Sequence, residues 1–107
     1  MSRILFDQNV PRGLRTVLSG HDVRTAMQMG WDQLGNGALI DAAEAAGFDI
    51  MVTADRNIRH QQNLSGRRLA LVVLEINHWP TIKPRSALVR DAVDRTQSGS
   101  CTVVTFP

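Results

Sequence analysis

An Asp-x-Asn motif occurs twice in this chain, at residues 7–9 and at residues 55–57, each shortly after a short apolar run. If both runs are neighbouring parallel strands, Asp7 and Asp55 leave the same edge of one sheet and lie close together. Two carboxylates at short range raise the pKa of one of them or require a cation between them. The pair is therefore predicted to bind a hard divalent cation, Mg²⁺ or Mn²⁺, as the cofactor of the site.

Arginines follow both motifs closely. The candidates for RNA binding are Arg12, Arg15, Arg56 and Arg59. A guanidinium stays charged and donates in pairs to phosphate oxygens, so these side chains would hold a phosphate chain beside the cation. Acids at the centre with arginines around them predict metal-assisted phosphodiester hydrolysis, in which the ion activates a water. The overall arginine excess, 11 of 12 basic residues, is by itself more simply explained by a coding bias.

The paired Asp residues also fit a structural role and a receiver domain. An Asp after a strand is often a turn former or a helix cap that accepts from its own backbone. Receiver domains of response regulators carry acids after strands one and three, but they need a hydroxyl after strand four and a lysine after strand five. Here residues 74–76 are Leu-Glu-Ile, and the single lysine, Lys83, precedes the last predicted helix. The sequence therefore disfavours a receiver domain and leaves the structural role open.

Length and composition indicate one globular domain over residues 1–107, with 43% hydrophobic and 21% charged residues. Cys101 is the single cysteine, so no internal disulfide can form and a cytoplasmic protein is expected. Three scattered histidines without a second cysteine do not suit a zinc site. No apolar run approaches the roughly 18 residues of a membrane span, and the run at residues 4–6 is too short for a signal-peptide core.

The apolar pattern alternates between strands and helices. Strands are expected at residues 4–6, 22–25, 50–52, 69–74 and 101–106, and helices at residues 14–18, 39–46, 58–64 and 85–96. Asn36 is expected to cap the second of these helices, and residues 77–84 are expected to form a loop. Such alternation predicts an α/β fold with a mostly parallel central sheet of four to five strands.

Several segments resemble a small family of PIN-like domains, compact relatives of VapC-type toxins. The segments that carry the likeness are residues 4–11 (ILFDQNVP), 36–40 (NGALI), 53–58 (TADRNI), 61–68 (QQNLSGRR) and 77–80 (NHWP). The likeness covers nearly the whole chain. It implies a three-layer α/β/α PIN-like fold and a Mg²⁺-dependent ribonuclease. Many members of this family are toxins that pair with a small DNA-binding antitoxin, and homodimers are common among them.

The resemblance assigns roles position by position. Asp7 and Asp55 match acidic positions of the family. Its polar positions correspond to Asn9, Asn36, Asn57, Gln62 and Asn63. Gln8 stands where the family usually has Glu, and Ala38 stands where Glu is frequent. PIN nucleases normally use three or four acids, so this chain retains a reduced set.

The helix after residue 36 offers one more acid. Asp41 is a candidate third catalytic carboxylate, although most charged helix residues are simply solvated. Gln8 and Asn36 can still offer neutral carbonyl oxygens, so weak metal binding, completed by the RNA phosphate, is expected. The alternative to a nuclease is a PIN-like scaffold with a degraded site, which binds an antitoxin or RNA without cleavage. The missing acids favour this alternative, and the retained pair opposes it.

Overall fold

The computed structural model of this chain describes residues 2–58, 64 and 66–107. Its five strands are β1 (Arg3–Phe6), β2 (Asp22–Thr25), β3 (Ile50–Thr53), β4 (Ala70–Leu74) and β5 (Cys101–Val104). The helices are α1 (Leu14–Val17), α2 (Asn36–Ala45), α4 (Trp79–Ile82) and α5 (Ala87–Arg95), with a 3₁₀ turn, η1 (Lys83–Arg85), between the last two. The predicted α/β class is confirmed. Most of the helix predicted at residues 58–64 lies outside the described residues.

All five strands are parallel, in the order β2-β1-β3-β4-β5. The chain runs outward from β1 to β2 and then returns to β3 on the other side of β1. The strand order therefore reverses between β1 and β3, which pair in register from Ile4↔Ile50 to Phe6↔Val52. In open parallel sheets a ligand binds beyond the carboxyl ends of the strands at such a switch point.

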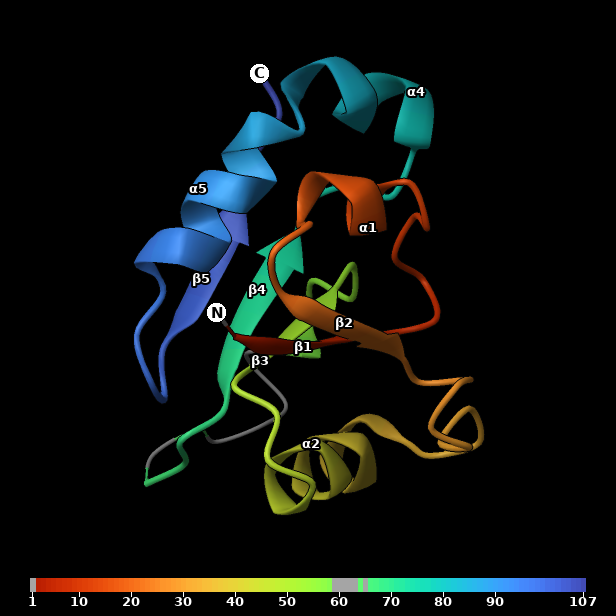
Figure 1. The fold of residues 1–107 in the computed structure, drawn as a ribbon, viewed down its shortest axis with the longest axis vertical. Helices are drawn as coiled ribbons and strands as arrows, with labels where there is room; N and C mark the ends of the chain where they lie inside the picture. Colours follow the sequence, from red (N-terminus) through yellow and green to blue (C-terminus); the bar gives the residue numbers. More distant parts are fainter. Residues whose placement is uncertain (1, 59–63, 65) are drawn as a thin grey trace.

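Alternating side chains of the strands divide the core into two layers. Ile4, Phe6 and Val52 face one side, where they pack with buried residues of α1, α4 and α5. Leu5 and Met51 face the other side, where α2 covers them. Figure 1 shows this arrangement, with α1, α4 and α5 on one side of the sheet and α2 on the other. The near-continuous apolar strands are explained by burial on both faces, and the layers are those of an α/β/α sandwich.

The predicted loop at residues 77–84 is wrong, because α4 and η1 occupy most of it. Pro80 stands in the first turn of α4, where its missing N–H needs no partner. Ile82 is fully buried against the sheet, and the Trp79 ring packs where a Cβ on Gly13 would collide with it. Tertiary burial thus makes a helix from a segment whose two prolines suggest a loop.

The start of α2 also differs from the sequence prediction. Gly35 precedes the helix with an extended backbone, and Asn36 is the first helical residue rather than its cap. The Asn36 side chain instead bonds to a residue outside the helix, Asp55. Across the ranges that the structure describes, none of the helices has the length and apolar character needed to span a membrane.

Candidate functional site

The switch point brings both Asp-x-Asn motifs to the carboxyl edge of the sheet. Asp7 follows β1 directly, and its backbone N–H donates to the carbonyl of Val52 at 2.9 Å. Asp55 lies two residues beyond the end of β3. Both side chains are half-buried. The predicted neighbourhood of the two motifs is therefore present, because β1 and β3 are adjacent.

One buried hydroxyl connects the two acidic residues. Thr53, the last residue of β3, is 0% exposed. Its Oγ1 donates to Asp7 Oδ2 at 2.8 Å and accepts from the backbone N–H of Asp55 at 3.1 Å. Sequence reasoning missed this role, although a lone hydroxyl between an apolar run and an acid was a usable signal. Thr53 fixes one Asp side chain and the other Asp backbone with a single group.

Two asparagines make further hydrogen bonds around the two acidic residues. Asn36, at the start of α2, donates from Nδ2 to Asp55 Oδ2 at 2.8 Å. Asn9 accepts at Oδ1 from the backbone N–H of Ala54 at 2.9 Å, which links the loop after β1 to the loop after β3. Asn36 belongs to α2, whereas Asn9 lies in the loop between β1 and α1. These two predicted support residues therefore hold the site together.

The remaining polar candidates play smaller parts. Gln8 is exposed, and its Nε2 donates to the carbonyl of Asp32 in the loop before α2. The Asn57 side chain is exposed, while its backbone N–H donates to Asp55 Oδ1 at 3.0 Å. Gln62 and Asn63 lie outside the described residues, as does Arg59.

Both carboxylates also make the turn contacts expected of a purely structural Asp. Asp7 Oδ1 accepts from the backbone N–H of Gln8 at 2.8 Å, and Asp55 forms an Asx turn with Asn57. A carboxylate has about four acceptor positions, so these bonds leave room for a further ligand. Hydrogen bonds to a ligating carboxylate are typical of metal sites because they fix its orientation. The turn roles and a ligand role are therefore compatible.

The donor set suits a hard cation bound weakly. Asp7 and Asp55 supply anionic oxygens, and Mg²⁺ sites commonly use one or two carboxylates together with waters and substrate phosphate. Among the residues that the structure describes, no three side chains of the types His, Cys, Asp or Glu come together to hold a metal. Within the described ranges, the charge available for binding is thus that of Asp7 and Asp55.

Asp41 is not brought to this pair. It is 66% exposed on α2 and forms an ion pair with Arg67, in the segment that precedes β4. Arg67 also pairs with Glu44 at 3.3 Å. The predicted third acid therefore interacts with a cation on another segment, and the described residues contain no cluster that joins it to Asp7 and Asp55.

The arginine candidates separate into two groups. Arg12 and Arg15 line a pocket of about 340 Å³ beside Asp7, between α1 and the loop after β2. Arg15 donates from Nη2 to the carbonyl of Val23 at 3.1 Å, so its position is fixed. Arg56 is exposed in the turn after Asp55. Two guanidinium groups thus share a pocket with Asp7.

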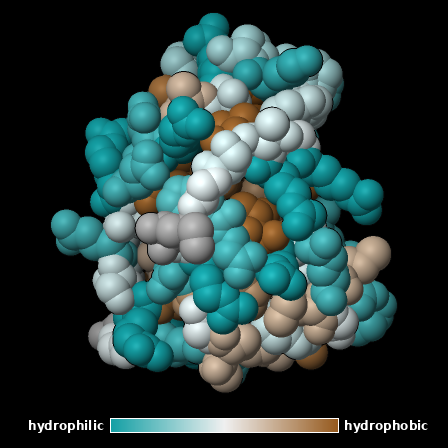
Figure 2. Space-filling view, in the orientation of Figure 1, coloured by the Kyte–Doolittle hydropathy of each residue, from teal (hydrophilic) through white to brown (hydrophobic). Residues whose placement is uncertain are grey.

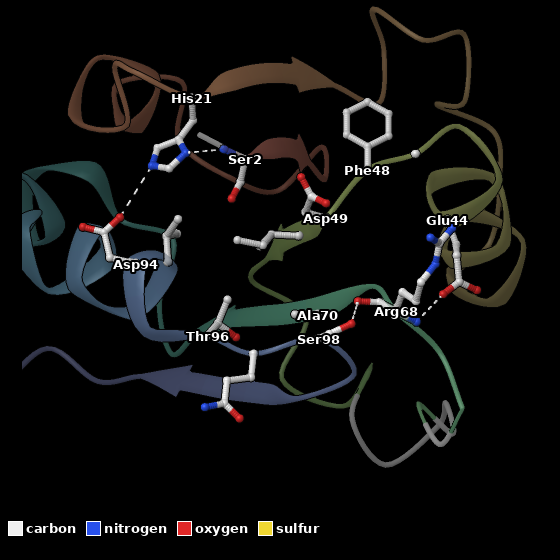
Figure 3. Close-up of a pocket in the computed structure, with 14 residues that line it drawn as sticks. Ser2, His21, Glu44, Phe48, Asp49, Arg68, Ala70, Asp94, Thr96 and Ser98 are labelled. Carbon is white, nitrogen blue, oxygen red and sulfur yellow. Dashed lines mark hydrogen bonds and ion pairs between the residues drawn. The ribbon is translucent and has the colours of Figure 1, made fainter.

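A larger pocket, of about 590 Å³, lies at the opposite edge of the sheet. In Figure 3 its polar side chains pair with neighbours: His21 Nδ1 accepts from the backbone N–H of Ser2 at 2.9 Å, and its Nε2 lies 3.5 Å from Asp94 Oδ1. Ser98 donates to the carbonyl of Arg68 at 2.8 Å. These contacts join segments of the fold that are distant in sequence.

Glu44 accepts two backbone hydrogen bonds at this edge. Its Oε1 accepts from the backbone N–H groups of Arg68 at 2.6 Å and Leu69 at 3.2 Å. The Arg68 N–H is the main reason that the pKa of Glu44 is lowered, followed by the Leu69 N–H and the charge of Arg67. Glu44 thus connects α2 to the segment that enters β4.

Comparison of the chain with protein-family models, with curated proteins and with solved structures finds no match. The resemblance to PIN-like domains therefore stays a prediction from the motifs.

Proposed function

We propose that this protein is a metal-dependent ribonuclease that hydrolyses phosphodiester bonds at the carboxyl edge of its sheet. The observation that carries the proposal is the buried Thr53 hydroxyl, which ties Asp7 to the loop of Asp55 at the switch point. A hydrogen bond that fixes the orientation of a carboxylate is typical of the groups that surround a metal site.

Asp7 and Asp55 would hold Mg²⁺ or Mn²⁺, with Asn36 and Asn9 fixing the loops that carry them. When bound, the ion supplies a Lewis acid for the phosphoryl oxygens and lowers the pKa of water. Arg12, Arg15 and Arg56 would bind the phosphates on either side of the scissile bond, because guanidinium groups donate in pairs to phosphate. Binding that needs the substrate phosphate is expected from a site with two carboxylates.

The motif resemblance extends the proposal to a biological role. The nuclease would be the toxin of a toxin–antitoxin pair in the cytoplasm, its partner would be a small DNA-binding antitoxin, and it would form a homodimer. Expression of the chain alone would then inhibit growth, and co-expression of the antitoxin would relieve the inhibition.

The test is cleavage of single-stranded RNA by the purified chain with Mn²⁺. Asp7→Asn and Asp55→Asn are expected to reduce the cleavage rate by at least about 100-fold, the scale seen when metal sites are disturbed. Asp91→Asn, an exposed acid on α5, is the matched control and should cleave like wild type. Wild-type protein that leaves RNA intact would contradict the nuclease proposal.

A second candidate function is a scaffold that binds RNA or an antitoxin without cutting. It is favoured by Gln8, which is exposed and donates to Asp32 where the family usually has an acid. Calorimetric titration separates the two candidates. A nuclease should release or absorb heat with Mn²⁺ in the presence of a non-cleavable nucleotide, whereas a scaffold should not.

A further inference from the structure

We propose that the pocket of about 340 Å³ beside Asp7 binds one nucleotide of a single-stranded RNA, with its phosphate on the arginines and its base on the loop after β2. The inference rests on the proposed function, because it places the nucleotide next to the bond that would be cut. The pocket lies between the start of α1 and the end of β2, at the same sheet edge as both carboxylates. Its volume is within the range of small-molecule sites, about 300–1,000 Å³.

The phosphate end of the pocket is formed by two guanidinium groups. Arg15 is held in place by its bond to the Val23 carbonyl, and its remaining N–H groups are available. The Arg12 side chain is exposed and makes no hydrogen bond or ion pair with any other residue in the described part of the chain. One fixed and one free guanidinium on the same pocket suit a group with several anionic oxygens.

The base end is formed by the loop after β2. Met27 is 59% exposed, the highest value among the large hydrophobic residues that the structure describes. Figure 2 shows moderately hydrophobic side chains gathered over α2 and the loop that precedes it, on a surface that is otherwise mostly hydrophilic. A thioether makes favourable contacts with aromatic rings, so Met27 offers a surface against which a nucleobase can pack.

Gln28 supplies a directional contact. Its Oε1 accepts from the backbone N–H of Thr25 at 2.9 Å, and its own N–H donates to Thr25 Oγ1 at 3.1 Å. This reciprocal pair fixes the side chain and uses one lone pair of Oε1, and the Nε2 group has two donors to offer a ligand. Guanine, cytosine and uracil present carbonyl oxygens as acceptors, whereas adenine has no carbonyl and accepts only at ring nitrogens, beside an amino donor. The pocket should therefore prefer a carbonyl-bearing base.

Single-stranded RNA is the substrate class that this geometry suits. A base can enter a pocket only when it is unstacked and unpaired, as in loops and single strands. The larger pocket at the opposite edge is a poorer candidate, since its polar groups form hydrogen bonds within the fold.

The experiment is an NMR titration of the ¹⁵N-labelled full chain with UMP, GMP and AMP in EDTA, which removes any contribution of a metal. Amide shifts are expected at residues 7–15 and 25–28, and UMP and GMP should bind about two- to tenfold more tightly than AMP, the effect of one hydrogen bond. Gln28→Glu keeps an acceptor for the Thr25 N–H but replaces the donors with an oxygen. It should shift the preference toward AMP, while Gln97→Glu, at the other edge, should leave it unchanged.

Three outcomes would overturn the inference: no shifts at millimolar nucleotide, shifts centred on Ser2, Asp49 and Ser98, or an unchanged base preference in Gln28→Glu. RNA cleavage with Mn²⁺ is measured on the same preparation. Cleavage without shifts at the pocket overturns this inference and leaves the nuclease proposal standing. Shifts at the pocket without cleavage overturn the nuclease proposal and leave nucleotide binding standing.

Discussion

The two edges of the central sheet use their polar residues in opposite ways. At the amino edge, charged and polar side chains bond to the backbone of other segments: Glu44 accepts from Arg68 and Leu69, and His21 accepts from Ser2. At the carboxyl edge, Asp7 and Asp55 are oriented by Thr53 and Asn36, yet each stays half-buried rather than enclosed. One edge holds the fold together and the other presents oriented groups to solvent.

The difference follows from where the strands begin and end. The segments that enter the sheet are joined by side-chain contacts, such as that between Arg3 and Asp49, 2.8 Å from backbone N to Oδ2, which gives these polar groups a structural use. Segments that leave the sheet at a switch point diverge to opposite faces and leave a crevice. Polarity alone therefore does not identify a functional site; the larger pocket is at the edge whose groups are already paired.

Thr53→Val should have the largest effect on the carboxyl edge, because it removes the hydroxyl and keeps the shape of the side chain. Asp7 Oδ2 and the Asp55 N–H both lose a partner, so Mn²⁺ affinity should fall about 10- to 100-fold, and the free energy of unfolding should fall by about 1–3 kcal/mol. Calorimetry and urea unfolding measure these changes. Thr53→Ser should restore both, and Thr105→Val, at an exposed position, is the matched control. Unchanged Mn²⁺ affinity in Thr53→Val would show that the hydroxyl has no part in a metal site.

Arg12→Ala tests the charged surroundings of the carboxyl edge. Removing one phosphate contact should weaken binding of single-stranded RNA and reduce the slope of log K against log salt by about 0.7. Affinity measured at several salt concentrations gives both values. Arg90→Ala, an exposed arginine on α5, should change neither. Equal slopes for wild type and Arg12→Ala would place RNA binding elsewhere.

Glu44→Gln tests the amino edge through pH. Because the folded pKa of Glu44 lies below its ordinary value of 4.5, its stabilising contribution is present above that value and is lost as the pH falls through the folded pKa. The Tm of wild type should thus decrease as the pH falls below about 4.5. Glu44→Gln should have a lower Tm than wild type at neutral pH, and its Tm should change less with pH. Its Mn²⁺ affinity at neutral pH should equal that of wild type. A loss of Mn²⁺ binding in Glu44→Gln would contradict the assignment of a structural role to the amino edge and of metal binding to the carboxyl edge.

Asp41→Asn should have the smallest effect. Since Asp41 is exposed and paired with Arg67, and an exposed ion pair contributes little to stability, its neutralisation should leave the fold intact and RNA cleavage within about twofold of wild type. A single-turnover cleavage assay measures this. A loss comparable to that of Asp7→Asn would return Asp41 to the catalytic set and require the Arg67 pair to open during the reaction.

Much of the fold could be predicted from local patterns. The five strand positions and the helices at α2 and α5 follow from apolar periodicity, and alternation of strands and helices predicts a parallel sheet. The segment at Trp79 could not be predicted in the same way, because its helix depends on burying Ile82 against the sheet and on the close approach of Trp79 to Gly13. A cap role for Asn36 is wrong because Gly35 takes the cap position, and the Asn36 side chain donates to Asp55, 19 residues away.

By itself, the sequence determined that acids follow the first and third strands, since the end of an apolar run and the residue after it are local facts. Only the tertiary structure decided that β1 and β3 are neighbours, that Thr53 joins the two acidic residues, and that Asp41 faces Arg67 instead. It also decided that Arg12 and Gln28 share a pocket. These relations depend on the order of the strands and on contacts between residues far apart in sequence; Thr53 and Asp7, for example, are 46 residues apart. Burial of the apolar faces determines both the strand order and these contacts.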